Sequence, residues 1–120
     1  MLVDTSVWVD HFRSRNAKLT AILESTDVWI HPFVIGELAC GTLSRRAQII
    51  ELLNALPRVP VVDHEEALEF VITHRLSGRG LGWIDVNLLA SAQLARVPFW
   101  TFDKRLAAVA RELMLKQPPS

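Results

Sequence analysis

The sequence predicts an α/β fold in which a mainly parallel sheet is covered by helices on both faces. Short apolar, strand-like runs occur at 2–3, 28–31 and 97–102, with a weaker run at 59–63. Between them lie segments with apolar residues every three or four positions, the spacing of amphipathic helices. Strands that alternate with helices favour a parallel sheet, because each helix returns the chain to the same edge.

The strand-like runs are short and mostly apolar, as expected for strands that are covered on both faces. The first run stands at residues 2–3 and is followed at once by Asp4. The last run leads in the same way to Asp103. Functional groups in such folds gather beyond the carboxyl ends of the strands. We therefore expect Asp4 and Asp103 at one edge of the sheet.

Helices are predicted between the strands from the spacing of apolar residues and from capping signals. A further helix is expected after Pro32. In the helix that follows Asp63, this residue is the expected N-cap, acids fill the first turn, and Gly78 is the expected stop. The segments with helical spacing are 18–25, 45–56, 63–80, 84–97 and 103–116.

The chain has 120 residues, half of them apolar, which is enough for one domain with its own core. We expect this domain to span 1–115 and the end, 116–120, to be frayed. No apolar run approaches the roughly 18 to 20 residues that a membrane span needs. The beginning of the chain lacks the features of a signal peptide. The expected location is the cytoplasm, without membrane contact.

Cysteine and histidine usage narrows the kinds of site that the chain can carry. Cys40 is the only cysteine, which excludes an internal disulfide and a thiolate metal cluster. The four histidines are scattered and show no zinc-ligand spacing. Any metal site must therefore be built from oxygen ligands.

Four acidic residues stand in places that need an explanation. Asp4 and Asp103 follow strands, Asp85 begins a helical segment, and Glu37 lies in the otherwise apolar segment 32–40. The three aspartates are also well placed as helix N-caps, and Glu37 could be a solvent-facing helix position. Each alternative is reasonable for one residue alone, but together they leave the convergence of the acids unexplained.

Convergence of these carboxylates would create a site for a hard divalent cation. Carboxylates without basic partners repel one another, and a cation relieves that repulsion. Oxygen ligands suit Mg²⁺, and Mn²⁺ is an alternative. Ser6, two residues after Asp4, could orient that carboxylate through a hydrogen bond.

Four motifs in order, "LVDTSVWVD", "GEL", "LGWIDVNLLASA" and "WTFDKRLAAVA", resemble those of the PIN domain family, and most closely its VapC-type toxins. The resemblance extends from residue 2 to about residue 111. It implies a three-layer α/β/α sandwich and a Mg²⁺- or Mn²⁺-dependent endoribonuclease. In the resemblance, Asp4, Glu37, Asp85 and Asp103 match the family's acidic quartet, which is both catalytic and metal-binding, and Ser6 matches a supporting polar residue.

The same resemblance implies partners. VapC-type toxins act on RNA, are held by a cognate antitoxin, and pair as homodimers. "SVWVDHF" places Val7, Trp8 and Phe12 near the start of the chain, and "FVIGELAC" is nearly all apolar. A small domain cannot easily bury both segments, so we expect an exposed apolar groove.

The charge distribution suits an RNA partner better than the net charge suggests. Thirteen basic and thirteen acidic residues cancel, but without the four site acids a net of +4 remains. A basic body favours contact with phosphates. Lys104 and Arg105, directly after Asp103, are the first candidates for phosphate contacts. Two further basic stretches contain Arg13, Arg15 and Lys18, and Arg75 and Arg79.

Two other interpretations stay open at this point. One is a PIN-like domain that binds RNA or protein without cutting it. The other is a phosphorelay receiver domain, which would need a pair of acids after the first strand, whereas Thr5 and Ser6 follow Asp4 here. The number of metal ions and the RNA sequence preference also stay open.

Overall fold

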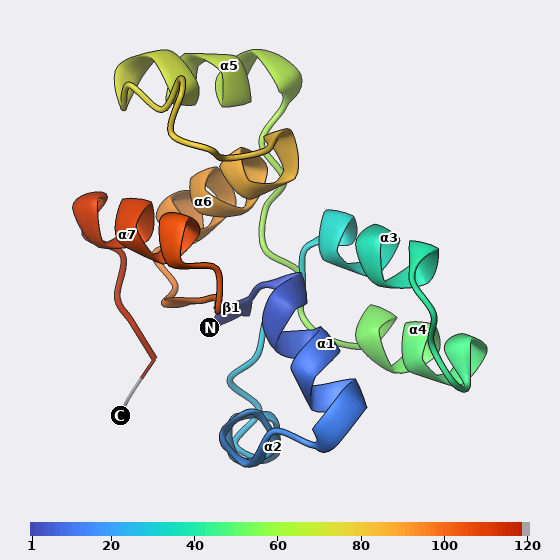
Figure 1. Ribbon diagram of the computed structural model, residues 1–120. Coiled ribbons are helices and arrows are strands. Elements are labelled where there is room, and N and C mark those ends of the chain that lie inside the picture. Colours follow the sequence, from blue (N-terminus) through green and yellow to red (C-terminus); the bar gives the residue numbers. More distant parts are fainter. Residues whose placement is uncertain (119–120) are drawn as a thin grey trace.

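The computed structural model describes residues 1–118, and this part of the chain forms two short strands and seven helices, six of which lie between the strands in sequence (Figure 1). The elements, in chain order, are β1 (Leu2–Val3), α1 (Thr5–Ser14), α2 (Ala17–Glu24), α3 (Pro32–Cys40), α4 (Arg46–Asn54), α5 (His64–Thr73), α6 (Trp83–Ala95), β2 (Phe99–Trp100) and α7 (Lys104–Glu112).

The centre of the fold is a small parallel sheet. β1 pairs in parallel with β2, with Leu2 opposite Phe99 and Val3 opposite Trp100. Single parallel bridges extend the sheet on the other side of β1, from Leu2 to Trp29 and then from Ile30 to Arg58. All pairings are parallel, so the carboxyl ends of β1 and β2 meet at one edge, as predicted.

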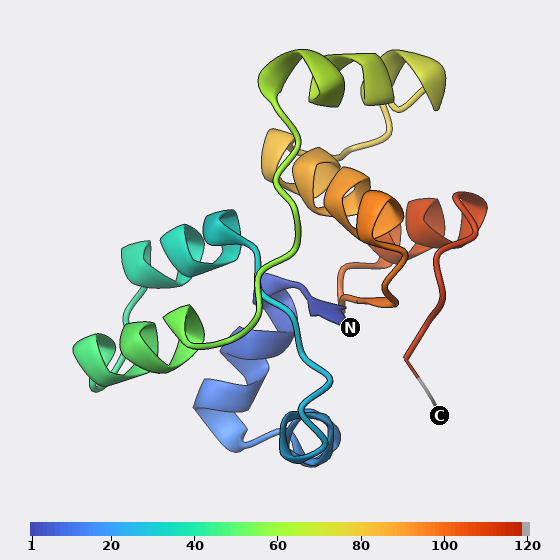
Figure 2. The same ribbon diagram turned by 180° about the vertical axis from the view of Figure 1, so that it is seen from behind.

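Helices lie on both sides of this sheet (Figures 1 and 2). In both views α5, α6 and α7 gather on one side of β1, and α1 to α4 gather on the other. α5 packs on α6, while α3 packs on both α1 and α4. The predicted fold class, a three-layer α/β/α sandwich with a parallel sheet, is confirmed.

The core runs through β1, β2 and α6. Leu2 and Val3 have no exposed surface, and Phe99 is almost completely buried. Seven consecutive residues of α6, Val86–Ala92, are also buried. A helix that is enclosed on all sides has no polar face, which is why this segment shows only weak amphipathic character.

The elements are shorter than the sequence patterns suggest. The expected strand at 28–31 is reduced to bridges at Trp29 and Ile30, and 59–63 forms no strand, because the ladder on that side ends at Arg58. α5 ends at Thr73, before the expected stop at Gly78, since Arg75 takes a left-handed conformation (φ 53°) that cannot continue a helix.

The end of the chain is only partly described. The carbonyl oxygen of Lys116 accepts a hydrogen bond of 2.9 Å from the backbone amide of Phe99. The predicted frayed tail, 116–120, includes positions 119–120, which lie outside the described residues, so the domain boundary stays a prediction. In residues 1–118, every helix is too short or too polar to cross a membrane.

Candidate active site

Asp4 occupies the point where β1 turns into α1. It is the N-cap of α1 and is only 6% exposed. Its Oδ2 atom accepts hydrogen bonds from the hydroxyl of Ser6 at 2.7 Å and from the hydroxyl of Thr101 at 2.8 Å. The sequence indicated the contact from Ser6, whereas the contact from Thr101 was missed.

Thr101 connects the ends of both strands. Its hydroxyl oxygen accepts a hydrogen bond of 3.0 Å from the backbone amide of Asp103 while its proton is directed to Asp4. The backbone amide of Phe102 donates to the hydroxyl of Ser6 at 3.0 Å. Two hydroxyls therefore tie the start of α1 to the start of α7. A threonine two residues before the last acid is the only sequence signal for this role.

Asp103 is the N-cap of α7. Its Oδ1 atom accepts hydrogen bonds from the backbone amides of Arg105 at 2.9 Å and Leu106 at 3.1 Å. The capping interpretation and the site interpretation are therefore compatible. Capping engages one carboxylate oxygen of Asp103 and leaves the other for a ligand.

Asp85 is the third residue of α6 and takes part in a capping box from that position, so its interpretation as the N-cap itself was wrong. Gly82 is the N-cap, and its backbone amide donates to Asp85 Oδ2 at 2.9 Å. Burial raises the pKa of Asp85, and the negative charges of Asp4 and Asp103 raise it further, against the opposing effect of the Gly82 hydrogen bond. The three aspartates thus lie close enough to act on one another electrostatically.

Glu37 approaches the same edge from α3. It is exposed to solvent, and its Oε1 atom accepts a hydrogen bond of 2.6 Å from the hydroxyl of Thr5, the neighbour of Asp4. Thr5 is the second hydroxyl residue that the sequence interpretation missed. Through Thr5, the glutamate on α3 is linked to the start of α1.

The four carboxylates share one arrangement. In each, the protein holds one oxygen with hydrogen bonds, and no described residue donates to the other oxygen. The only ion pair among residues 1–118 joins Arg79 to Glu112, so no basic side chain neutralises the four acids there. Free carboxylate oxygens without cationic partners are the donors that Mg²⁺ and Mn²⁺ prefer.

The carboxylates do not form a closed cage. In the described part of the chain, no three Asp, Glu, His or Cys side chains stand close enough to hold one metal ion together. Mg²⁺ commonly binds one or two carboxylates, keeps several waters, and takes further oxygens from substrate phosphates. An open set of acids therefore fits this ion by its chemistry.

The basic residues next to the site differ in their surroundings. Lys104 and Arg105 are the first two residues of α7, and both are exposed. The side chain of Arg105 crosses Gly80, where an added Cβ would stand only 2.7 Å from Nη1. Arg79 is engaged with Glu112, which leaves it less suited to a phosphate contact.

Some apolar residues near the start of the chain are buried in the core, and some line a cavity. The expectation of exposure was wrong for Val7 and Trp8, which are 0% and 3% exposed because both belong to the hydrophobic core. Trp8 and Phe12 nevertheless line a cavity of about 270 Å³ together with Leu52 and Leu56 of the α4 segment. An apolar hollow between α1 and α4 is therefore present.

Comparison with known proteins gives the family. The sequence profile of the PIN domain matches residues 1–112. The chain belongs to the PIN domain family. Two relatives of this PIN domain, both called Ribonuclease VapC32, come from Mycobacterium tuberculosis strains CDC 1551 / Oshkosh and ATCC 25618 / H37Rv. Each is 46% identical over 113 residues, which cover 93% of this chain and 91% of the relative. The resemblance to VapC-type toxins is thereby confirmed.

Proposed function

We propose that this PIN domain is a metal-dependent endoribonuclease, the toxin of a VapBC-type toxin–antitoxin module. The relatives named as ribonucleases support the activity. The observation that carries the proposal is the set of four carboxylates, each with one oxygen held by the protein and the other without a donor.

The residues of the proposed active site have different roles. Asp4 and Asp103 are the proposed principal metal ligands, and Asp85 and Glu37 complete the acidic surface. A bound Mg²⁺ or Mn²⁺ would supply a water of lowered pKa and would polarise the phosphate. Ser6 and Thr101 fix the orientation of Asp4, and Thr5 fixes that of Glu37. Fixed ligands need little rearrangement during the reaction.

RNA cleavage with and without a chelator tests the proposal. The purified protein should cut RNA in Mg²⁺ or Mn²⁺, lose that activity in excess EDTA, and regain it when the metal is restored. Cleavage that continues unchanged in EDTA contradicts the metal mechanism. RNA binding without cleavage in either metal would instead establish the non-catalytic interpretation. A preparation of Asp103→Asn controls for contaminating ribonuclease.

The proposed partner is the cognate antitoxin, which would bind the toxin in the cytoplasm. The cavity between α1 and α4 is lined mainly by apolar side chains, and Leu52 at its edge is 69% exposed. Such a surface suits an apolar segment of a partner protein. Co-expression with the neighbouring reading frame should yield a complex, and Leu52→Asp should weaken it while cleavage by the free toxin persists.

We also propose a homodimer. Phe33 on α3 and Trp83 on α6 are 37% and 40% exposed, and with Ile84 they line one open hollow. Large exposed aromatic residues are enriched at protein interfaces. Light scattering at high protein concentration should give the mass of a dimer, and Trp83→Asp should give that of a monomer. A monomer from the unmodified chain would contradict the proposal.

A further inference from the structure

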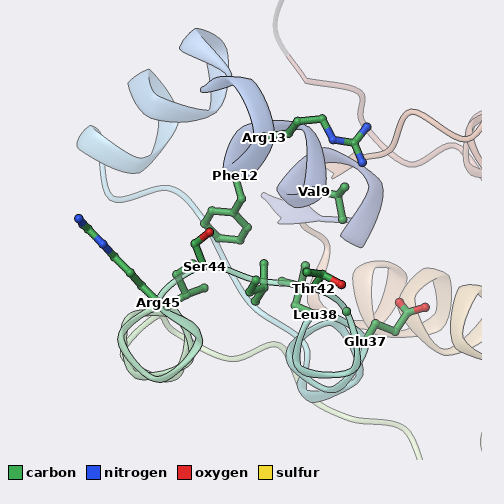
Figure 3. A pocket seen from close by; sticks show the side chains of 11 residues that line it. Val9, Phe12, Arg13, Glu37, Leu38, Thr42, Ser44 and Arg45 are labelled. Atoms are coloured by element: carbon green, nitrogen blue, oxygen red, sulfur yellow. The ribbon is translucent and has the colours of Figure 1, made fainter.

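A second, larger cavity opens beside the proposed active site. It lies between α1 and the turn that joins α3 to α4, and its volume is about 650 Å³, within the usual range for ligand sites. Figure 3 shows Glu37 at one end of this space, Arg45 at the other, and the ring of Phe12 projecting into it. Because Glu37 belongs to the acidic quartet, the cavity continues directly from that site.

The cavity carries positive charge. Arg13 of α1 and Arg45 before α4 both line it, and no described acidic residue pairs with either. Glu37 is the only acid in the lining, and its Oε1 atom is engaged by Thr5. Away from the catalytic end, the surface is therefore suited to anions.

The lining also contains hydroxyl groups and an aromatic ring, which can contact a nucleoside through hydrogen bonds and stacking. The hydroxyls of Thr42 and Ser44 are in the lining and make no hydrogen bond within the described chain. Phe12 presents an aromatic surface, and its ring is stacked on Trp8 with a centroid separation of 5.7 Å and an interplanar angle of 22°. Stacked support limits the movement of the Phe12 ring, which favours contact with a planar base.

The wall opposite α1 is held in place before any ligand arrives. Arg46 donates from Nη2 to the carbonyl oxygen of Gly41 at 2.6 Å and so closes the turn between α3 and α4. Arg45 adopts a left-handed conformation, φ 55°, which places it outside the helical path of α4. The geometry thus exposes the Arg45 side chain while Arg46 braces the turn.

We propose that this cavity is the binding site for the RNA nucleotide next to the cleaved phosphate, with Arg13 and Arg45 contacting the backbone phosphates on that side. The proposal rests on the proposed ribonuclease function. A peptide occupant is less favoured, because two unpaired arginines would need acidic residues from it, whereas every nucleotide of RNA brings a phosphate.

Binding of a labelled single-stranded RNA, followed by fluorescence anisotropy in EDTA, tests the cavity apart from catalysis. The double variant Arg13→Gln/Arg45→Gln should weaken binding several-fold. The logarithm of the association constant decreases linearly with the logarithm of the salt concentration. The magnitude of this slope should be smaller by about 1.4 in the double variant, because each lost phosphate contact on a single strand contributes about 0.7.

The double variant Arg96→Gln/Arg111→Gln is the matched control. Arg96 has the same left-handed backbone as Arg45 (φ 56°), and Arg111 stands in the last turn of α7 as Arg13 does in α1. This control should bind RNA as the unmodified protein does. Thermal melts should show that both double variants are folded.

The outcomes separate the two proposals. If the unmodified protein cleaves RNA but both double variants bind it equally well, the cavity proposal is overturned and the ribonuclease function stands. If no RNA is cleaved but Arg13→Gln/Arg45→Gln alone loses RNA binding, the cavity binds RNA, whereas the ribonuclease function and the placement of the nucleotide next to a cleaved phosphate are both wrong. If that variant loses binding to the antitoxin only, the cavity is a protein-docking site and our proposal is wrong.

Discussion

Thr101 donates a hydrogen bond of 2.8 Å to Asp4 although 97 positions separate the two residues in the chain. The same Asp4 oxygen also accepts from Ser6, so the carboxylate is held from both strand ends. The backbone amide of Ser6 donates to Oδ2 as well, so Asp4 can present only Oδ1 to a ligand. The hydroxyl of Thr101 thus decides which way the first acid of the site faces.

Replacing Thr101 by Val should weaken the site without removing an acid. The change removes the donor to Asp4 and the acceptor for the Asp103 amide, and such supporting contacts are typically worth about 10- to 100-fold in activity or metal affinity. Thr101→Ser keeps the hydroxyl and should retain most activity. Steady-state cleavage rates over a range of Mg²⁺ concentrations measure the effect. Equal loss in both variants would show that the methyl packing of Thr101 matters, and not its hydroxyl.

Asp4→Asn and Asp103→Asn should abolish cleavage and leave the metal-free protein at least as stable. Asn keeps the shape and caps helices about as well as Asp, while it removes one charge from a set of repelling carboxylates. Added Mg²⁺ should raise the melting temperature of the unmodified protein by mass action, and should do so much less in either variant. Equal metal-induced shifts in all three proteins would exclude both residues from the metal site.

Gly80→Ala should destabilise the fold more than Gly78→Ala. Both glycines have left-handed backbones, φ 79° and 74°, which cost a side-chain-bearing residue roughly 1–2 kcal/mol. A Cβ on Gly80 would also stand 2.9 Å from Cδ of Arg105, whereas one on Gly78 would meet nothing within 4 Å. Chemical denaturation of the two variants measures the difference.

An Arg105→Ala background provides the control for that comparison. If contact with Arg105 causes the extra cost at Gly80, the two alanine variants should become equally stable once the arginine side chain is removed. If Gly80→Ala remains less stable than Gly78→Ala in the Arg105→Ala background, the backbone conformation of the loop causes the difference in stability.

His31 should make the protein less stable as the pH falls below neutrality. Its side chain is completely buried, Nδ1 accepts from the Phe33 amide at 2.9 Å, and burial lowers its pKa to about 4. The unfolded chain takes up a proton near pH 6.5, while the folded protein does so only near pH 4. The stability of the fold therefore decreases from pH 6.5 to 4, by up to about 1.4 kcal/mol per pH unit.

A His31→Asn variant isolates this contribution. Asn can cap α3 in place of the imidazole, so this variant should be less stable at pH 7 through lost packing but should show a flatter decline between pH 6.5 and 5. The matched control is His64→Asn, at an exposed position. Parallel stability curves for the His31→Asn variant and the unmodified protein would contradict the assignment.

The alternation of short apolar runs with helical segments was sufficient to predict the fold class. Strand lengths could not be predicted, because apolar residues such as Val61 continue beyond the last bridge and are exposed there. The end of α5 was also missed. Gly78 is the stronger stop signal in the sequence, but Leu76 turns back into the core and ends the helix earlier.

The candidate acids could be found from the sequence because each stands at an element boundary or in an apolar segment. Their supporting hydroxyls could not be found in the same way. Thr5 and Thr101 are ordinary residues in the sequence, and their importance comes from contacts with Glu37 and Asp4 across 32 and 97 positions. Only the folded arrangement reveals which hydroxyl faces which carboxylate.

The pairing of β1 with β2 has a consequence for the order of events during protein synthesis. Translation produces Leu2 well before its partner Phe99. A nascent chain that has not yet released β2 from the ribosome has neither the Thr101 contact nor Asp103 beside Asp4. A ribonuclease built this way is inert until the segment that carries β2, Thr101 and Asp103 has been synthesised and has left the ribosome.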